Sequence, residues 1–341
     1  MKSFELFILK NLRCVSFYSL FRASRWSCEG IILETISFRF IILDYLIFLV
    51  IVLINIAFIT LFERKILGYS QRRLGPNKPS FAGLLQPMAD AVKLFLKTHF
   101  SPGTTHKFIF FIGPRISLML VFWVWLTAPF KFDSSFFAYS AILIIIVIRI
   151  NVYPLLLIGW ASNNKYSILG GLRRVAQTIS YEISLALIVI TVLILIRGLR
   201  LDFLAKAKTF YRILIISPVI FLFWVISRVA ETNRTPFDFS EGERELVSGF
   251  NTEYGAGGFA LIFIAEYGRI YFLRIITSYL FCPRTRFVII RIFARIIIFA
   301  WVWLRRTFPR YRYDLLINLA WKRILPITLA LNVIILAVIL L

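Results

Sequence analysis

Long apolar runs alternate with shorter polar segments along this chain, and the pattern predicts helices that cross a membrane. The run at 40–62 reads FIILDYLIFLVIVLINIAFITLF and contains one charged residue, Asp44. A helix needs about 20 predominantly apolar residues to cross the ~30 Å hydrocarbon core of a bilayer. The sixth such run is interrupted by Glu266 and Arg269. Runs near this length predict eight spans, at 40–62, 108–128, 138–160, 179–198, 211–230, 257–280, 287–304 and 324–341.

A short amphipathic helix is predicted between the first two spans, over LLQPMADAVKLFLK at residues 84–97. Pro87 stands at its start, while Asp90, Lys93 and Lys97 fall on the side opposite the apolar positions. Such a helix lies in the membrane interface rather than across it. A plain surface anchor is the alternative, but it does not account for Asp90 so near the apolar face.

Composition excludes a soluble globular enzyme. Of the 341 residues 60% are hydrophobic and 17% charged, whereas soluble domains have roughly 45–50% and about 25%. The net charge of +23 would suggest nucleic-acid binding in a soluble protein. In a membrane protein, Lys and Arg instead gather in the inner loops, close to anionic headgroups. We therefore expect anionic lipids and no nucleic acid as partners.

Four loops hold most of the unusual sequence, namely the first, third, fifth and seventh, at 63–107, 161–178, 231–256 and 305–323. Alternate loops of a helical membrane protein lie on the same side, so these four are predicted to share one face. They contain eight, three, two and six basic residues respectively. This excess predicts that the four loops lie inside and that both termini lie outside.

Acidic residues are concentrated in the fifth loop, which holds six of the 17 Asp and Glu residues. A solvated acidic loop is one interpretation, but the apolar residues between the acids indicate a folded segment. Ser240 and Glu243 fit a capping box that opens a helix. Glu241 and Glu245 then lie one turn apart and repel each other. Coupled carboxylates of this kind have separated apparent pKa values, which suits proton relay.

Four further carboxylates lie at or inside predicted spans: Glu63, Glu182, Glu231 and Glu266. An ionisable group at membrane depth costs several kcal/mol unless it is hydrated or paired, so each is a functional hypothesis. For Glu63 we expect Arg64 or Lys65 as the partner, with an interface anchor as the alternative. For Glu182 the nearest basic residues along the chain are Arg173 and Arg174, two turns or more away.

No metal or cluster site is expected in this chain. Its three cysteines are scattered, and two histidines do not form a ligand spacing typical of zinc or iron–sulfur sites. Neither a phosphate-binding loop nor a dinucleotide fingerprint is present. Any redox groups would therefore belong to other subunits.

Five long motifs, in order along about residues 40–341, carry a resemblance to a known family. The chain resembles the NADH dehydrogenase subunit 1 family, the quinone-site membrane subunit of respiratory complex I. The motifs are ERKILGYSQRRLGPNKPSFAGLLQPMADAVKLFLK (63–97), GWASNNKYSILGGLRRVAQTISYE (159–182), AETNRTPFDFSEGERELVSGFNTEY (230–254), IAEY (264–267) and FPRYRYDLLINLAWKRILP (308–326).

The resemblance implies an all-α scaffold of eight transmembrane helices with a site that ubiquinone enters from the membrane. It further implies that NADH, FMN and the iron–sulfur relay belong to partner subunits, and that this chain begins the acidic path coupling quinone reduction to proton translocation. The matching acidic positions are Glu63, Asp90, Glu182, Glu231, Glu241, Glu243, Glu245, Glu253 and Glu266. The matching quinone-site positions are Arg64, Arg73, Lys93, Arg173, Arg234, Phe237, Asp238, Arg305, Arg310 and Arg312.

Some positions depart from the family. Arg174, Arg244 and Arg306 stand where small residues are usual, and Thr98 and His99 replace an acidic residue and a proline. We expect the extra arginines to pair with Glu241 or Glu245. Residues 1–39 and the loop at 277–287 are interpreted as lineage-specific. The predicted organisation is an N-terminal extension at 1–39, surface-lying or a transit-type segment, followed by one transmembrane domain at 40–341.

The predicted function is that of a core subunit of a proton-pumping NADH:quinone oxidoreductase, with the membrane-arm and peripheral-arm subunits as partners. One alternative is an ion or solute transporter, although no internal repeat relates 40–160 to 179–304. Another is a lipid-binding anchor, which leaves Glu182 and Glu266 without a role. The many Phe and Ile residues favour the mitochondrial inner membrane over a bacterial plasma membrane.

Overall fold

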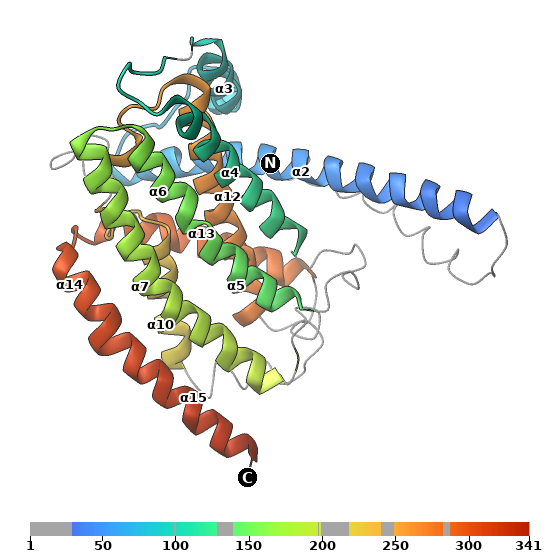
Figure 1. The fold of residues 1–341 in the computed structure, drawn as a ribbon, viewed down its shortest axis with the longest axis vertical. Helices are drawn as coiled ribbons and strands as arrows, with labels where there is room; N and C mark the ends of the chain where they lie inside the picture. Colours follow the sequence, from blue (N-terminus) through green and yellow to red (C-terminus); the bar gives the residue numbers. More distant parts are fainter. Residues whose placement is uncertain are drawn as a thin grey trace. The chain divides into compact units, whose positions relative to one another are not determined.

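All regular secondary structure in the described part of the chain is helical. The computed structural model describes residues 29–98, 100–127, 139–196, 198, 218–239, 249–281 and 287–340, and these contain no strand (Figure 1). The chain divides into two units, Met1–Ile51 and Val52–Leu341, and the contacts given below lie within the second. The predicted all-α class is confirmed.

Every predicted span coincides with at least one observed helix. The helices are α2 Glu29–Ser70, η2 Phe81–Gly83, α3 Gln86–Leu96, α4 Lys107–Leu126, α5 Ser140–Ile150, α6 Val152–Ala161, α7 Lys165–Ile196, α10 Pro218–Glu231, η4 Gly249–Asn251, α12 Ala256–Phe281, α13 Phe287–Thr307, α14 Tyr313–Asn318, η5 Leu319–Ile324 and α15 Leu325–Leu340. Of these, η2 and η4 are 3₁₀ turns, whereas η5 is a π-helical segment.

Five stretches are long and apolar enough to cross a membrane: Leu43–Ser70, Lys107–Leu126, Ser140–Ala161, Lys165–Leu195 and Tyr313–Val338. The helices α10, α12 and α13 do not reach this standard in the described part. For α10 only 14 residues are described. Helix α12 carries Glu266 and two arginines, and α13 carries four arginines.

Three predicted elements differ in their boundaries. Helix α2 runs from Glu29 to Ser70, beyond both ends of the span predicted at 40–62 and into the segment predicted as an N-terminal extension. Helix α7 begins at Lys165, so most of the segment predicted as the third loop is helical. Its polar side chains lower the hydropathy, yet several of them are buried against protein rather than exposed to water. The Asn164 side chain accepts a hydrogen bond from the backbone N–H of Tyr166 at 3.1 Å and so caps the helix start. The third span is divided at Asn151 into α5 and α6.

Helix α7 is the centre of the described assembly, because it contacts α5, α6, α10 and α15 as well as η4 (Figure 1). Helix α4 packs between α6 and α12, and α12 also contacts α13. Small residues allow α6 and α7 to approach closely. A Cβ atom added at Gly159 would lie 3.2 Å from the Cα of Gly171. Close helix packing of this kind is typical of interfaces with small residues in membrane proteins.

The four motif-bearing loop regions contact one another. Asn163 donates to the Thr104 carbonyl at 3.1 Å, which joins the first region to the third. Asn164 donates to Glu253 at 2.7 Å and so joins the third region to the fifth. Thr235 donates to the Arg305 carbonyl at 3.2 Å, which connects the fifth to the seventh. The contacts agree with the predicted common face.

Candidate functional site

A buried carboxylate on α12 is held between two guanidinium groups. Glu266 is 7% exposed. Its Oε1 lies 2.6 Å from Nη1 of Arg174, on α7, and its Oε2 lies 3.3 Å from Nη2 of Arg234, in the segment after α10. This ion triplet therefore joins three segments that are far apart in the sequence.

Aromatic rings hold both arginines of the triplet. The Arg174 guanidinium carbon lies 4.2 Å from the centre of the Phe250 ring, and that of Arg234 lies 5.3 Å from the centre of the Tyr267 ring. Cation–π attraction of this kind strengthens when water is excluded. Arg174 was expected to pair with an acid of the 241–245 stretch. That stretch lies outside the described residues, and the observed partner of Arg174 is Glu266.

A second buried cluster surrounds Glu63, near the end of α2. The Tyr267 hydroxyl donates to its Oε2 at 3.0 Å, and Arg305 forms an ion pair with its Oε1. The predicted partners are wrong: Arg64 pairs with Asp90 at 2.7 Å, and Lys65 donates to the Ala82 carbonyl. Consecutive helix residues point about 100° apart, because a turn takes 3.6 residues, so side chains next to Glu63 face other surroundings.

Glu182 on α7 and Glu231 at the end of α10 are also buried, but neither forms an ion pair within the described residues. Both carboxylate oxygens of Glu231 lack a hydrogen-bond partner there. Arg269 on α12 acts electrostatically on both acids, while Arg149 acts on Glu182 and Arg228 on Glu231. The two acids are therefore near positive charge without direct contact.

Three buried arginines of this region were not among the predicted site residues: Arg228, Arg269 and Arg274. Arg269 faces the side-chain oxygen of Asn151, at the break between α5 and α6, when that amide is oriented to accept. Arg228 donates to the Thr277 hydroxyl, and Arg274 lies over the Trp301 ring with its guanidinium carbon 4.6 Å from the ring centre. An arginine inside an apolar run was the available signal, but only Arg269 was noted, as an interruption of the sixth predicted span.

The remaining predicted residues of the fifth and seventh regions lie close to these clusters. Phe237 is buried, and its carbonyl accepts a hydrogen bond from Gln177 at 3.0 Å. Arg310 lies over the Phe239 ring, and Arg312 immediately precedes α14. Arg73 is exposed in the turn after α2. Arg173, on α7, acts electrostatically on Tyr313, and the Asp238 side chain is partly buried. The acids Glu241, Glu243 and Glu245, together with Arg244, lie outside the described residues.

Glu253 and the neighbouring Tyr254 fix the start of α12. The Tyr254 ring stacks on Phe110 with 4.1 Å between ring centres, and its hydroxyl donates to the Phe110 carbonyl at 3.3 Å. Burial raises the pKa of the Tyr254 hydroxyl, so it stays protonated and keeps its role as a donor. Glu253 accepts from Asn164 and thus has a structural partner on the α7 side.

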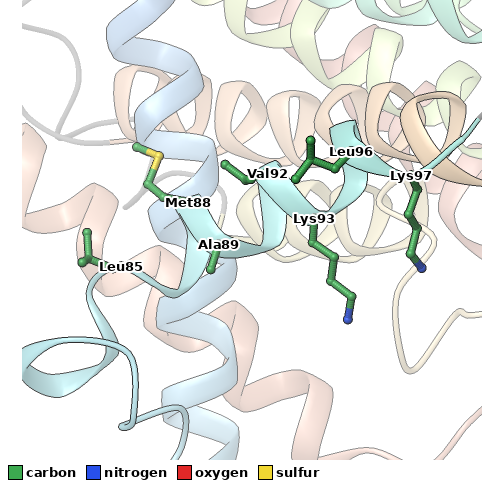
Figure 2. Close-up of a pocket in the computed structure, with 7 residues that line it drawn as sticks. All are labelled: Leu85, Met88, Ala89, Val92, Lys93, Leu96 and Lys97. Carbon is green, nitrogen blue, oxygen red and sulfur yellow. The ribbon is translucent and has the colours of Figure 1, made fainter.

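An open apolar groove of about 740 Å³ lies along α3, whose position confirms the predicted amphipathic helix. In Figure 2, Val92 and Leu96 lie on one side of the helix, whereas Lys93 and Lys97 extend together on another. Asp90 accepts from both Arg64 and Gln86, which ties the helix to the end of α2. The groove is lined by Leu85, Met88, Ala89, Val92, Lys93, Leu96 and Lys97.

Comparisons with known proteins all identify the same family. Residues 43–337 match a family model described as NADH dehydrogenase. The chain is 46% identical over 286 residues to NADH-ubiquinone oxidoreductase chain 1 of Aedes aegypti, covering 83% of this chain and 91% of the relative. It is 43% identical to the protein of the same name from Locusta migratoria, covering 84% and 92%. For the Artemia franciscana protein the identity is 44% and the coverage 84% and 95%.

Proposed function

The chain belongs to the NADH dehydrogenase subunit 1 family of respiratory complex I, and from that premise we propose that it forms the quinone entrance and the first carboxylates of the proton-coupling path. It is a subunit of an oxidoreductase complex. The electrons reach the quinone from partner subunits that carry NADH, FMN and iron–sulfur clusters. Ubiquinone is the substrate that this chain helps to place.

One observation carries the proposal: the open apolar groove of α3 is joined by side chains to the end of α2, where the buried carboxylates begin. The Arg64–Asp90 pair makes this connection on the α3 side. Glu63, one residue earlier on α2, faces inward to Tyr267 and Arg305. A quinone has an apolar tail and a polar head, so the groove fits the tail and the cluster fits chemistry at the head.

Quinone reduction explains why buried carboxylates would stand beside arginines. The reaction takes up electrons and protons together, so negative charge develops where water is scarce. Two charges 4 Å apart interact by about 4 kcal/mol at an effective dielectric constant of 20, against about 1 kcal/mol in bulk water. A change of charge at the quinone therefore alters the protonation of nearby acids. Among those described, Glu182 and Glu231 are free to respond because no ion pair fixes them.

We place the chain in the mitochondrial inner membrane with about eight spans. The five candidate spans support a multi-pass membrane protein, and α10, α12 and α13 would supply the others. The relatives named above are animal NADH-ubiquinone oxidoreductase chains. Anionic headgroups and the other membrane-arm and peripheral-arm subunits would cover the basic face.

Labelling with a photoreactive ubiquinone analogue in the assembled complex tests the entrance. We expect labelled peptides within 63–97 or 231–254, and we expect excess ubiquinone to prevent the labelling. Replacing Val92 by Asn in the groove should reduce labelling several-fold. The matched control is Val333→Asn, at an exposed valine on α15. Labels confined to 287–304 and 324–341, or a Val92→Asn variant that labels like the parent, would contradict this entrance.

A further inference from the structure

The buried carboxylates of the site differ in how tightly cations hold them. Each oxygen of Glu266 faces its own guanidinium group, at 2.6 Å and 3.3 Å. Glu231 has no hydrogen-bond partner on either oxygen within the described residues. Glu182 forms no ion pair among the described residues either. A path that moves protons cannot use all three acids in the same way, because a proton on Glu266 would leave the buried Arg174 and the partly buried Arg234 uncompensated.

We propose that Arg174 is a positioning residue that keeps Glu266 ionised during turnover, so that proton exchange is left to Glu182 and Glu231. This assignment rests on the proposed function and divides its carboxylates into a fixed charge and exchanging groups. Arg234 alone, at the longer distance of 3.3 Å and more exposed than Arg174, is not sufficient for this role.

Among the described residues, Arg174 has no ion-pair partner other than Glu266. Its side chain is 2% exposed and therefore cannot turn to water. The Phe250 ring covers one face of the guanidinium group. A planar guanidinium held in this way loses little freedom when it pairs with a carboxylate. Arg174 thus presents a fixed positive charge to Oε1 of Glu266.

Charged groups from each neighbouring element act on this pair. Arg174 and Glu182 come from α7, Arg234 follows α10, and Arg269 lies one turn from Glu266 on α12 itself. Glu231, at the end of α10, acts on Arg269. Arg269 is thus shared among the three acids, whereas the one ion pair of Arg174 among the described residues is with Glu266. Removing Arg174 should therefore change Glu266 first.

Three replacements separate the charge of Arg174 from its bulk. Arg174→Ser removes both, Arg174→Met keeps most of the packing on Phe250 but removes the charge, and Arg174→Lys keeps the charge. If the positive charge of Arg174 keeps Glu266 ionised, the Arg174→Met variant behaves like Arg174→Ser, and Arg174→Lys behaves like the parent. The matched control is Arg115→Ser, at an exposed arginine of α4 for which the described residues offer no ion pair.

The decisive measurement is infrared difference spectroscopy of the whole complex, between its oxidised and NADH-reduced states. The carbonyl stretch of a protonated carboxyl group reports which acids change protonation. In the parent, Glu182→Gln or Glu231→Gln should remove a carboxyl signal, and Glu266→Gln should remove none. Arg174→Ser and Arg174→Met should each add a new signal that disappears again when Glu266→Gln is combined with them. Arg174→Lys and Arg115→Ser should add none.

The same complexes, reconstituted into vesicles, give protons pumped per NADH across a pH series. At the acidic end of the series, the Arg174→Ser and Arg174→Met variants should pump at least about tenfold fewer protons per NADH, because Glu266 would then take up a proton. The Arg174→Lys variant should pump like the parent. A redox-dependent signal that Glu266→Gln removes in the parent would overturn the assignment, as would unchanged spectra and pH profiles in both Arg174→Ser and Arg174→Met. A parent complex that reduces quinone without pumping would instead remove the proposed coupling path, and this role with it.

Discussion

Glu182 and Glu231 are the buried acids that form no ion pair with an arginine among the described residues, and single replacements there are the most direct probes of coupling. We expect Glu182→Gln to leave the complex assembled, since the amide keeps the shape of the carboxylate and removes a buried charge that has no ion pair among the described residues. Quinone-coupled pumping should fall on the order of tenfold, which corresponds to about 1.4 kcal/mol. Pumping by reconstituted vesicles and the yield of complex measure the two effects.

Asp314→Asn is the matched control, because Asp314 is an exposed acid in the first turn of α14. There the lost interaction with the helix dipole is worth only about 0.3–1 kcal/mol. Pumping by an assembled Glu182→Gln complex at the level of the Asp314→Asn complex would take Glu182 out of the path.

The ion pair between Arg305 and Glu63 leads to a second prediction at the scale of single residues. Arg305→Met should destabilise the subunit by about 3–5 kcal/mol, because it leaves the buried Glu63 carboxylate without its cation. Adding Glu63→Gln should recover most of that loss. The loss of assembled complex on heating, compared among the two single variants and the double variant, measures the coupling. A double variant no more stable than Arg305→Met would show that the pair does not stabilise the fold.

The sequence predicted which acidic residues lie at membrane depth, but not which residues pair with them. Glu63 was assigned to its chain neighbours, whereas its partners come from α12 and α13, more than 200 residues away in the case of Tyr267. Depth in an apolar run identifies a buried charge from local sequence alone. The residue that pairs with a buried charge depends on how the helices are arranged, and a local sequence pattern does not contain that arrangement.

Helix α7 approaches η4 so closely that the contact requires a glycine at position 170. A Cβ atom at Gly170 would lie 3.0 Å from both the Cα of Gly249 and the N of Phe250. These are backbone atoms, so Gly170→Ala must displace η4 from α7, at a cost of about 1–3 kcal/mol. We expect a lower thermal midpoint of quinone reductase activity. Gly255→Ala is the control, since nothing lies within 4 Å of its Cβ position; equal midpoints for the two variants would contradict this contact.

The positions of the helices were predictable where the side chains that are shielded from water are also apolar. The helices α2, α4 and α12 were predicted because lipid and protein neighbours both favour apolar side chains. The start of α7 was missed because Arg174, Gln177 and Thr178 are polar yet buried. Polar residues that face protein inside a membrane look like a loop in a hydropathy profile. The break at Asn151 was missed for the opposite reason, because the residues on both sides of it are apolar.

As a whole chain, the protein is expected to depend on its partners for redox chemistry. Purified from its native membrane through a tag on this subunit, it should bring with it subunits that contain flavin and iron–sulfur clusters, detected by absorbance and electron paramagnetic resonance. Washing with salt should leave them bound, because contacts between subunits of a stable complex bury large apolar surfaces. Isolation of the chain alone, with quinone reductase activity, would contradict its assignment to a complex.

The meeting of the four loop regions on one face was predictable from topology alone, since alternate loops share a side. What the structure adds is the set of contacts, such as Asn164 with Glu253 and Thr235 with Arg305. The acids of 241–245, on which the sequence hypothesis of proton relay relied, lie outside the described residues and remain a prediction.

The buried charges of the described residues have a consequence for stoichiometry. Among side chains exposed by no more than 9%, four carboxylates, Glu63, Glu182, Glu231 and Glu266, stand against four arginines, Arg174, Arg228, Arg269 and Arg274. The interior is thus close to electroneutral, although the chain as a whole carries +23. A proton that enters this interior must be balanced by a charge that leaves it, so the acids can exchange protons one for one but cannot store them.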